Sequence, residues 1–372
     1  MRKQKIAVIG KGNAGCLSAV HFNHYHSNYE TELYYDPVIQ PVPTGQGSTL
    51  DYPDLLWRCL GTNWQDKFPV TVKKGIMYEN WGKIKNSFFH PFPFGQYSVH
   101  CSPKDFQDFI TNNVKINFKK TEEHILDCND IDADYIIDCR GTPKTLENYN
   151  TLINPLNAAL LSNLPKKEND VEFTRCIATP HGWTFYIPLP DTTSVGYLYN
   201  SDITSKQEAE DDFKERFKVN KINHSITFNQ YVAKEPIINK RIFLNGNKLF
   251  FLEPLEATAM GTYIVANKLY SSAIDGHCSI EDSRLKLKDY INKVEEFILW
   301  HYLKGSKFNT PFWEYAKDLS LKNKSSSLQK VVEDSLNFNN EEKHYTRDSN
   351  FKYAQWGLFN IKNWIEGVNV CK

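Results

Sequence analysis

Three glycines near the N-terminus have the spacing that accommodates the pyrophosphate of a dinucleotide. They are Gly10, Gly12 and Gly15. The first permits a tight turn, the second lets the backbone approach a pyrophosphate, and the third lets a helix pack close to a strand. Asp36 lies about 20 residues beyond the last glycine, where an acidic side chain can hold a ribose hydroxyl. The pattern predicts a dinucleotide site, and a glycine-containing surface turn is the alternative.

The elements around this turn fit the same prediction. The apolar run 5–9 is of strand type, residues 16–22 are compatible with a helix, and residues 32–35 form a second strand that ends at Asp36. In a strand-turn-helix unit the phosphates sit at the helix N-terminus. We therefore expect Asn13 and Ala14, with the three glycines and Asp36, to bind the cofactor.

Further segments indicate a mixed α/β fold. Residues 133–142 read as a buried parallel strand that ends in a glycine turn, as a doubly wound sheet requires. Residues 194–199 and 248–252 predict two more strands. Pro103, after Ser102, is expected to begin a helix, and a long amphipathic helix is expected to start at Asp282 or Ser283 and to end at Gly305.

Composition limits the classes of function. With 372 residues the chain can bury a large core, and we expect two intimately joined modules. The chain has 44 lysine and arginine residues and 44 aspartate and glutamate residues. No broad basic field is therefore expected to attract nucleic acid or an anionic membrane. The charged N-terminus lacks the apolar core of a secretory signal, and no apolar run approaches about 18 residues. These features predict a cytoplasmic protein.

The cysteines predict neither a metal site nor a disulfide framework. Eight are scattered through the chain without a Cys-x-x-Cys pair, so metal-ligand spacing is missing. We expect them to be small buried apolar side chains in a reducing compartment.

A second group of motifs lies outside the glycine turn. The motifs are Trp183-x-Phe185-x-Ile187-Pro188, the run 72–81 containing Lys73, Phe89-His90-Pro91-Phe92, the run 253–258 containing Glu256, and the loop 44–49 containing Gln46 and Gly47. Together with the glycine turn they resemble the flavin-dependent halogenases, the family that includes the tryptophan halogenases. The resemblance runs from the first strand to about residue 265 and then thins out.

Several positions depart from the family pattern. The family hallmark is Trp-x-Trp-x-Ile-Pro, and Phe185 here takes the place of the second tryptophan. Ala257 and Ala259 replace a serine and a glycine, and Gln46 stands where a glutamate is common. Loss of the glycine at 259 affects the close backbone approach that a halide site needs.

The resemblance implies a fold and a cofactor. The fold is an FAD-binding doubly wound, Rossmann-like module of the glutathione-reductase/monooxygenase type, with an additional β-sheet and a helical C-terminal substrate-covering module. The expected division places the FAD-binding module at 1–275 and the helical module at 276–372. Gln46, Gly47, Trp183, Phe185, Ile187 and Pro188 are expected to join the glycine turn in binding FAD.

The resemblance also implies a chemistry. FADH2, O2 and a halide ion would yield hypohalous acid, HOX. Lys73 would bind HOX through its ammonium or form a haloamine through its amine, and in either form it would hold the electrophile over one carbon of an electron-rich aromatic substrate. Glu256 would stabilise the developing charge, accept the departing proton or assist the polarisation of HOX. Halide is expected near the backbone of Thr258 and Ala259, and substrate near His90 and Phe92.

Each of these roles has a structural alternative. Lys73 and Glu256 could be solvated surface charges, and the neighbouring Lys74 blurs the register. His90 and Phe92 could be a packed histidine and a core ring. Trp183 and Phe185, which as a wall beside the flavin would separate halogenation from hydroxylation, could simply pack in the core.

The resemblance bears on partners as well. No second nucleotide fingerprint for NAD(P)H is present, so a separate flavin reductase is expected to supply FADH2. The substrate class is a phenol, indole or pyrrole, free or carrier-bound. A flavin monooxygenase or reductase of the same fold, or a catalytically idle flavin-binding protein, are the alternative functions.

Overall fold

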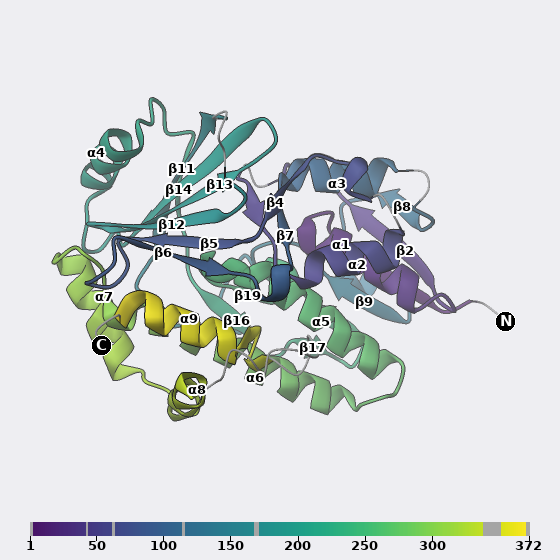
Figure 1. Ribbon diagram of the computed structural model, residues 1–372. Coiled ribbons are helices and arrows are strands. Elements are labelled where there is room, and N and C mark those ends of the chain that lie inside the picture. Colours follow the sequence, from purple (N-terminus) through teal and green to yellow (C-terminus); the bar gives the residue numbers. More distant parts are fainter. Residues whose placement is uncertain are drawn as a thin grey trace. The chain divides into compact units, whose positions relative to one another are not determined.

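The computed structural model describes residues 3–41, 44–61, 64–113, 116–166, 171–337 and 351–369. The chain divides into two compact units, whose elements are labelled in Figure 1. Unit 1 comprises residues 1–70, 101–152 and 230–289, and unit 2 comprises 71–100, 153–229 and 290–372. Each unit is thus assembled from three separate stretches of chain. The expected division after residue 275 stays a prediction.

A mostly parallel six-stranded sheet forms the centre of unit 1 (Figure 1). The strands, in spatial order, are β17 (Ile237–Ile238), β18 (Ile242–Leu244), β9 (Tyr135–Asp138), β1 (Lys5–Ile9), β2 (Glu30–Tyr35) and β8 (Lys119–Glu122). Only the edge strand β17 pairs antiparallel. β1 is buried from Ile6 to Ile9, as expected for a parallel sheet covered on both faces.

Helices pack around this sheet. α1 (Asn13–Tyr25) follows β1 directly and contacts α2 (Asp51–Leu60), α3 (Pro103–Asn112) and α5 (Thr258–Ile274). Unit 1 also contains β3 (Gln46–Gly47), the small sheet β10 (Tyr149–Thr151), β16 (Tyr231–Ala233) and β19 (Phe250–Phe251), and the short 3-10 helices η1 (Trp64–Asp66), η3 (Cys128–Asp130), η4 (Gly246–Lys248) and η5 (Leu255–Ala257). The predicted α/β class is therefore confirmed.

Unit 2 is built on a seven-stranded sheet. The strands, in spatial order, are β15 (His224–Thr227), β11 (Ala158–Pro165), β14 (Thr192–Tyr199), β13 (Gly182–Pro188), β12 (Thr174–Thr179), β5 (Gly75–Glu79) and β6 (Ser87–Pro91). β13, in the middle, is buried along its whole length, because both of its faces are covered.

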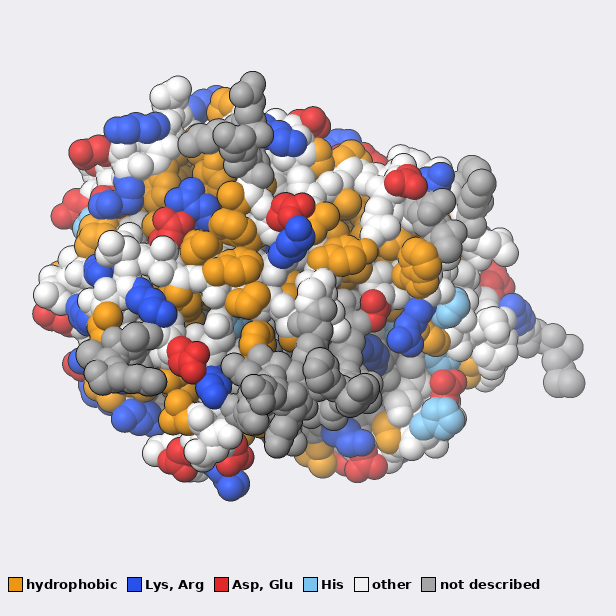
Figure 2. All heavy atoms as spheres, viewed as in Figure 1, with side chains coloured by type: hydrophobic (Ala, Val, Ile, Leu, Met, Phe, Trp, Pro, Cys, Tyr) orange, Lys and Arg blue, Asp and Glu red, His pale blue; other side chains and the backbone are white. Residues whose placement is uncertain are grey.

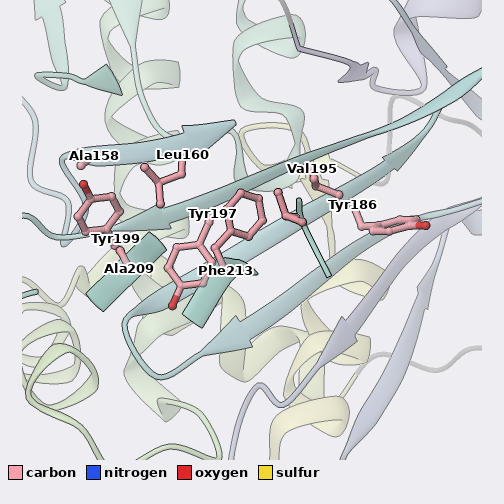
Figure 3. Packing of buried hydrophobic residues seen from close by; sticks show 9 residues of the cluster. Ala158, Leu160, Tyr186, Val195, Tyr197, Tyr199, Ala209 and Phe213 are labelled. Carbon is pink, nitrogen blue, oxygen red and sulfur yellow. The ribbon is translucent and has the colours of Figure 1, made fainter. Parts of the chain in front are cut away.

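The two faces of β13 are covered by different elements. On one face Tyr186 joins Val195 and Tyr197 of β14 and Phe213 of α4 (Lys206–Phe217) in a buried cluster, shown in Figure 3. Trp183 lies on the opposite face, because side chains alternate along a strand. There its ring is near those of Trp81 and Tyr302.

The remaining elements of unit 2 are four short strands and several helices. They are β4 (Val70–Lys73), η2 (Pro93–Gly95), β7 (Ser98–Cys101), η6 (Tyr302–Lys304), α7 (Pro311–Lys322), α8 (Ser326–Leu336), the pair β20 (Phe351–Tyr353) and β21 (Trp356–Gly357), and α9 (Leu358–Asn369). α6 (Ile280–His301) contributes residues to both units. An additional sheet and a helical C-terminal region, both expected, are therefore present.

The predicted ends of some helices and strands differ from those in the structure. α1 begins at Asn13 rather than at residue 16, so Gly15 lies inside the helix. α6 begins at Ile280, and Ser279 accepts the backbone N–H of Asp282 at 2.9 Å, so the predicted cap at Asp282 or Ser283 was wrong. The strand expected at 248–252 is limited to two residues because a 3-10 turn occupies Gly246–Lys248.

The charges on the surface and the state of the cysteines agree with the expectations from the amino-acid composition. On the face shown in Figure 2, basic and acidic side chains are interspersed. The cysteines in the described part of the chain are free thiols, mostly buried, and Cys371 lies outside it. No helix among the described residues is both long and apolar enough to cross a membrane.

Two buried histidines of unit 1 share one hydroxyl. The Nε2 atoms of His21 and His26 lie 2.7 and 2.9 Å from the Oγ of Ser271 on α5, and Nδ1 of His26 lies 3.2 Å from Asp275. Burial lowers the pKa of His21 to about 3. Burial also lowers the pKa of His26, against the opposing effect of Asp275. Both imidazoles are therefore neutral in the folded protein at pH 7.

This pair predicts that stability falls as the solution is acidified. Below about pH 6.5 the unfolded chain protonates histidine while folded His21 stays neutral, so each pH unit down to about 3 costs up to about 1.4 kcal/mol. We expect urea unfolding at pH 5 to show a lower free energy of unfolding than at pH 7, with a smaller difference in His21→Gln. His224→Gln, at an exposed position on β15, is the matched control. An unchanged pH dependence in His21→Gln would contradict the assignment.

Candidate functional site

The glycine turn of unit 1 is a tight junction between β1 and α1. Gly10 has φ +102°, and a Cβ there would lie 2.7 Å from the carbonyl oxygen of Cys139. A Cβ on Gly15 would lie 1.7 Å from the carbonyl oxygen of Gly10, whereas one on Gly12 would meet nothing within 4 Å. Gly10 and Gly15 therefore serve the close packing of strand and helix, and the backbone at Gly12 borders open space.

Polar side chains flank this turn. The Asn13 amide donates to Oε1 of Gln46 at 2.6 Å, and the Gln107 amide donates to Asn13 at 3.4 Å. The structure thus joins two of the predicted cofactor residues, and Gly47 follows Gln46 in β3. Ala14 lies in the first turn of α1, where a Cβ added to Gly246 would touch it at 2.7 Å.

Asp36 lies just past the end of β2. Its carboxylate accepts the backbone N–H of Val38 at 2.8 Å and contacts Nδ1 of His124 at 2.7 Å. These two interactions lower the pKa of Asp36, that of Val38 most. The carboxylate is therefore ionised at neutral pH, as an acceptor for a ribose hydroxyl must be.

Two adjacent lysines at the end of β4 have opposite environments. Lys73 is 3% exposed, and its Nζ lies 5.4 Å from the centre of the Phe92 ring. The Lys74 side chain is 58% exposed and forms an ion pair with Glu172. Of the two candidates for the family lysine, only Lys73 is buried. The alternative of a solvated surface charge therefore fits Lys74 and not Lys73.

His90 and Phe92 flank Pro91 at the end of β6. His90 is buried, and its two ring nitrogens lie 3.0 and 3.4 Å from the side-chain amides of Asn363 and Asn360 on α9. Phe92 is half-buried beside Lys73. The structure therefore places Phe92 next to the candidate lysine and holds His90 against α9.

The aromatic motif occupies the middle strand of unit 2. Trp183 is buried and donates its indole N–H to the hydroxyl of Tyr302 at 3.1 Å. Phe185 lies across Gly196 of β14, where a Cβ would come within 2.1 Å of its ring. Ile187 is buried, and the carbonyl of Pro188 accepts the hydroxyl of Thr71 at 2.6 Å. Both aromatic rings are thus fixed by contacts within the unit.

The acidic motif of unit 1 has an unusual backbone. Glu256 and Ala257 have φ values of +62° and +57° just before α5 begins at Thr258. Left-handed non-glycine residues cost on the order of 1–3 kcal/mol each and cluster at functional sites. Thr258 is buried and donates its hydroxyl to the carbonyl of Glu253 at 3.3 Å, and Ala259 follows it in the first turn. Helix α5 thus begins directly after two residues in the left-handed conformation.

Sequence reasoning missed a chain of polar groups behind Lys73. His100 of β7 is fully buried, with Nδ1 3.2 Å from the hydroxyl of Thr71 and Nε2 2.8 Å from that of Thr174. Burial, and then the charge of Lys73, hold the pKa of His100 well below its usual range. The one sequence signal was that Thr71 stands two residues before Lys73 and therefore on the same side of the strand.

The fold and the glycine turn define an α/β protein of the dinucleotide-binding class. The tryptophan halogenase family profile matches residues 5–129 and 111–368, and the chain belongs to that family. The resemblance stated from the motifs is therefore confirmed.

Among curated relatives, the chain is similar to tryptophan 7-halogenase RebH of Lentzea aerocolonigenes, with 26% identity over 215 residues, 51% of this chain and 39% of the relative. It is also similar to tryptophan 6-halogenase SttH of Streptomyces toxytricini, with 27% identity over 221 residues, 53% and 40% of the two chains. The matched region thus spans about two fifths of each relative's length.

Solved structures of the same fold align over almost the whole chain. The SttH structure has a TM-score of 0.81 at 16% identity and covers 99% of this chain and 91% of its own. Xcc4156, a flavin-dependent halogenase from Xanthomonas campestris, has a TM-score of 0.78 at 16% identity, covering 97% and 89%. At this identity the likeness shows the fold.

The contacts of the glycines predict that an added methyl group lowers the thermal stability strongly at one position and hardly changes it at another. Gly15→Ala should lower Tm strongly or prevent folding, because the added Cβ would collide with the Gly10 carbonyl. Gly12→Ala should change Tm by no more than about 2 °C, because its φ of −60° suits alanine and the space is open. Thermal unfolding of both variants measures this, and equal losses of Tm would show that the turn is built differently.

Proposed function

We propose that the protein is a flavin-dependent halogenase that transfers halogen from HOX to an electron-rich aromatic ring. The observation that carries the proposal is the contrast at the end of β4, where Lys73 is buried beside an aromatic ring and Lys74 is in solvent. Burying an ammonium group removes it from water at a cost in free energy, and a cost of this kind is typical of functional residues. The coincidence of this lysine with the family lysine favours the assignment.

The glycine turn fits FAD. The open space at Gly12, the N-terminus of α1 without a side-chain cap and the ionised Asp36 are the features that a pyrophosphate and a ribose require. Gly10, Gly12, Asn13, Ala14 and Gly15 would hold the phosphates, and Asp36 would hold the ribose. Gln46, Gly47, Trp183, Phe185, Ile187 and Pro188 are the further proposed contacts. Bound as FADH2, the cofactor would supply two of the four electrons that reduce O2, and halide would supply the other two as it becomes HOX.

Lys73 then acts on HOX. Its ammonium donates a hydrogen bond to the oxygen of HOX, which makes the halogen more electrophilic and fixes its position. The ring carbon forms a bond to the halogen as the halogen–oxygen bond breaks, and the ring loses a proton, so that the aromatic compound and HOX become the halogenated compound and water. The Phe92 ring next to Nζ offers an apolar surface for the aromatic substrate.

Glu256 is the proposed base for the ring proton. A carboxylate can stabilise the positive charge that develops on the attacked ring and then accept its proton. The left-handed backbone at Glu256 and Ala257 supports a functional role, because strained residues of this kind cluster at functional sites. Halide is proposed to bind at the backbone of Thr258 and Ala259, where the first N–H groups of α5 lack intrahelical acceptors.

The aromatic strand would keep the organic substrate away from the flavin. Trp183 and Phe185 are held rigidly by Tyr302 and by the surface over Gly196. A rigid barrier would admit a small anion to the cofactor and would keep an aromatic ring away from it. This arrangement favours halogenation over hydroxylation, and a separate flavin reductase is the proposed source of FADH2.

The cofactor site can be tested without turnover. Gly12→Ala should fold but should bind FAD at least about tenfold more weakly in a fluorescence titration, because its methyl group would occupy the approach of the pyrophosphate. Asp275→Asn, remote in sequence from the turn, serves as the control. Wild-type affinity in Gly12→Ala would place the cofactor elsewhere.

The adjacent lysines provide a matched test of the chemistry. With FAD, a flavin reductase, NADH, O2 and chloride, bromide or iodide, we expect a halogen mass shift on members of a panel of phenols, indoles and pyrroles. Lys73→Ala should lower kcat by about 100-fold or more, because positioning of HOX is lost, and Lys74→Ala should leave kcat within about twofold of wild type.

Three results would count against halogenation through Lys73. Equal activity of the two alanine variants would remove the lysine from the mechanism. Addition of oxygen without halogen would identify a monooxygenase. Flavin binding without any product across the panel would favour the idle flavin-binding alternative.

A further inference from the structure

In the polar chain around His100, the chemistry of the groups determines which one donates and which one accepts in each hydrogen bond. The hydroxyl of Thr71 donates its single proton to the carbonyl of Pro188, which can only accept. Thr71 Oγ1 can therefore only accept from His100, so Nδ1 of His100 carries a proton. Nε2 of the neutral ring is then the acceptor and takes the hydroxyl proton of Thr174. Every bond of the chain is thereby assigned.

The chain links strands that each carry part of the proposed site. Thr71 lies on β4, two residues before Lys73, and His100 lies on β7, the neighbouring strand. Thr174 begins β12, and Pro188 ends β13, the strand that carries Trp183 and Phe185. The bonds to Thr71 thus fix the lysine strand to the end of the aromatic strand.

The neutral state of His100 matters to its neighbour. The ring is fully buried, and both burial and the charge of Lys73 disfavour its protonation. A cationic ring at this place would repel the Lys73 ammonium. A neutral imidazole can donate to Thr71 and accept from Thr174 without adding charge, which a lysine or arginine could not do.

We propose that His100 is a positioning residue for Lys73, acting through its Nδ1–H bond to Thr71. The inference rests on the proposed halogenase function and assigns to His100 no contact with substrate or cofactor. The hydroxyl of Thr71 donates to the Pro188 carbonyl and so sets the position of the β4 end relative to β13, and with it the place of Nζ. The Nδ1–H bond from His100 holds that hydroxyl in place. Loss of that bond releases HOX that is not transferred to the ring, while formation of HOX continues.

Two amide substitutions separate the two ring nitrogens. In His100→Asn the side-chain NH2 stands near the place of Nδ1 and can still donate to Thr71. In His100→Gln the amide oxygen stands near the place of Nε2, where it can accept from Thr174, and the bond to Thr71 is lost. Thr71→Val removes the hydroxyl and keeps the branched shape, so it tests the bond even where a His100 variant folds poorly. His224→Gln, at an exposed position of the same unit, is the control.

The readout is the partition of halogen between an aromatic substrate and a diketone that traps free HOX, both present in one reaction. In wild type we expect most halogen on the aromatic compound. In Thr71→Val and His100→Gln the ratio of aromatic product to trapped halogen should fall by between about 10-fold and 100-fold, since a misplacement of about 1 Å can cost 100-fold. Their summed halogen and their KM should stay within about twofold of wild type, and His100→Asn should retain most of the ratio.

Other outcomes separate this proposal from the proposed function. An unchanged ratio in Thr71→Val would overturn the positioning role. A fall in total halogen with an unchanged ratio, or equal effects of His100→Asn and His100→Gln, would show a merely structural histidine. If wild type halogenates neither compound, the halogenase function fails and the positioning role fails with it.

Discussion

The structure depends on the burial of one ammonium group. Lys73 is almost completely removed from water at the end of a short strand, whereas the next residue, Lys74, extends into solvent and pairs with Glu172. Lys73 is the last residue of β4 and Lys74 follows it, and consecutive side chains of an extended chain point to opposite sides. A shift of one residue in this strand would exchange the two lysines, so the register of β4 determines which amine could meet a reactive electrophile.

Several hydrogen bonds in unit 2 hold β4 in that register. The Thr71 hydroxyl binds the Pro188 carbonyl, and His100 binds Thr71 and Thr174. His100 is fully buried, so its polar atoms are costly to leave unpaired. Apolar packing alone would tolerate small displacements of β4, but a chain of directed hydrogen bonds admits few. The hydrogen bonds of these polar groups thus fix the position of β4, and the buried hydrophobic cluster around Tyr186 and Tyr197 stabilises the sheet.

The glycine turn could be predicted from the sequence, whereas the exact start of α1 and the hydrogen bonds of His100 could not. The Gly10–Gly15 turn was predictable because each glycine answers a local steric demand, as the contacts of Gly10 and Gly15 show. The start of α1 was missed because a helix that begins within the turn leaves no separate cap signal. The His100 chain could not be predicted, since its partners come from strands far apart in sequence. The contact of His90 with α9 likewise depends on residues about 270 positions away.

Selective acylation of lysines is the measurement that tests the central claim most directly. Brief treatment of the folded protein with a bulky, charged N-hydroxysuccinimide ester, followed by fragment mass spectrometry of the peptide that contains both lysines, gives the two rates of modification. We expect Lys74 to react like other exposed lysines and Lys73 to react at least about tenfold more slowly, because it is buried. Equal rates at the two positions would contradict the buried amine, and with it the role proposed for Lys73.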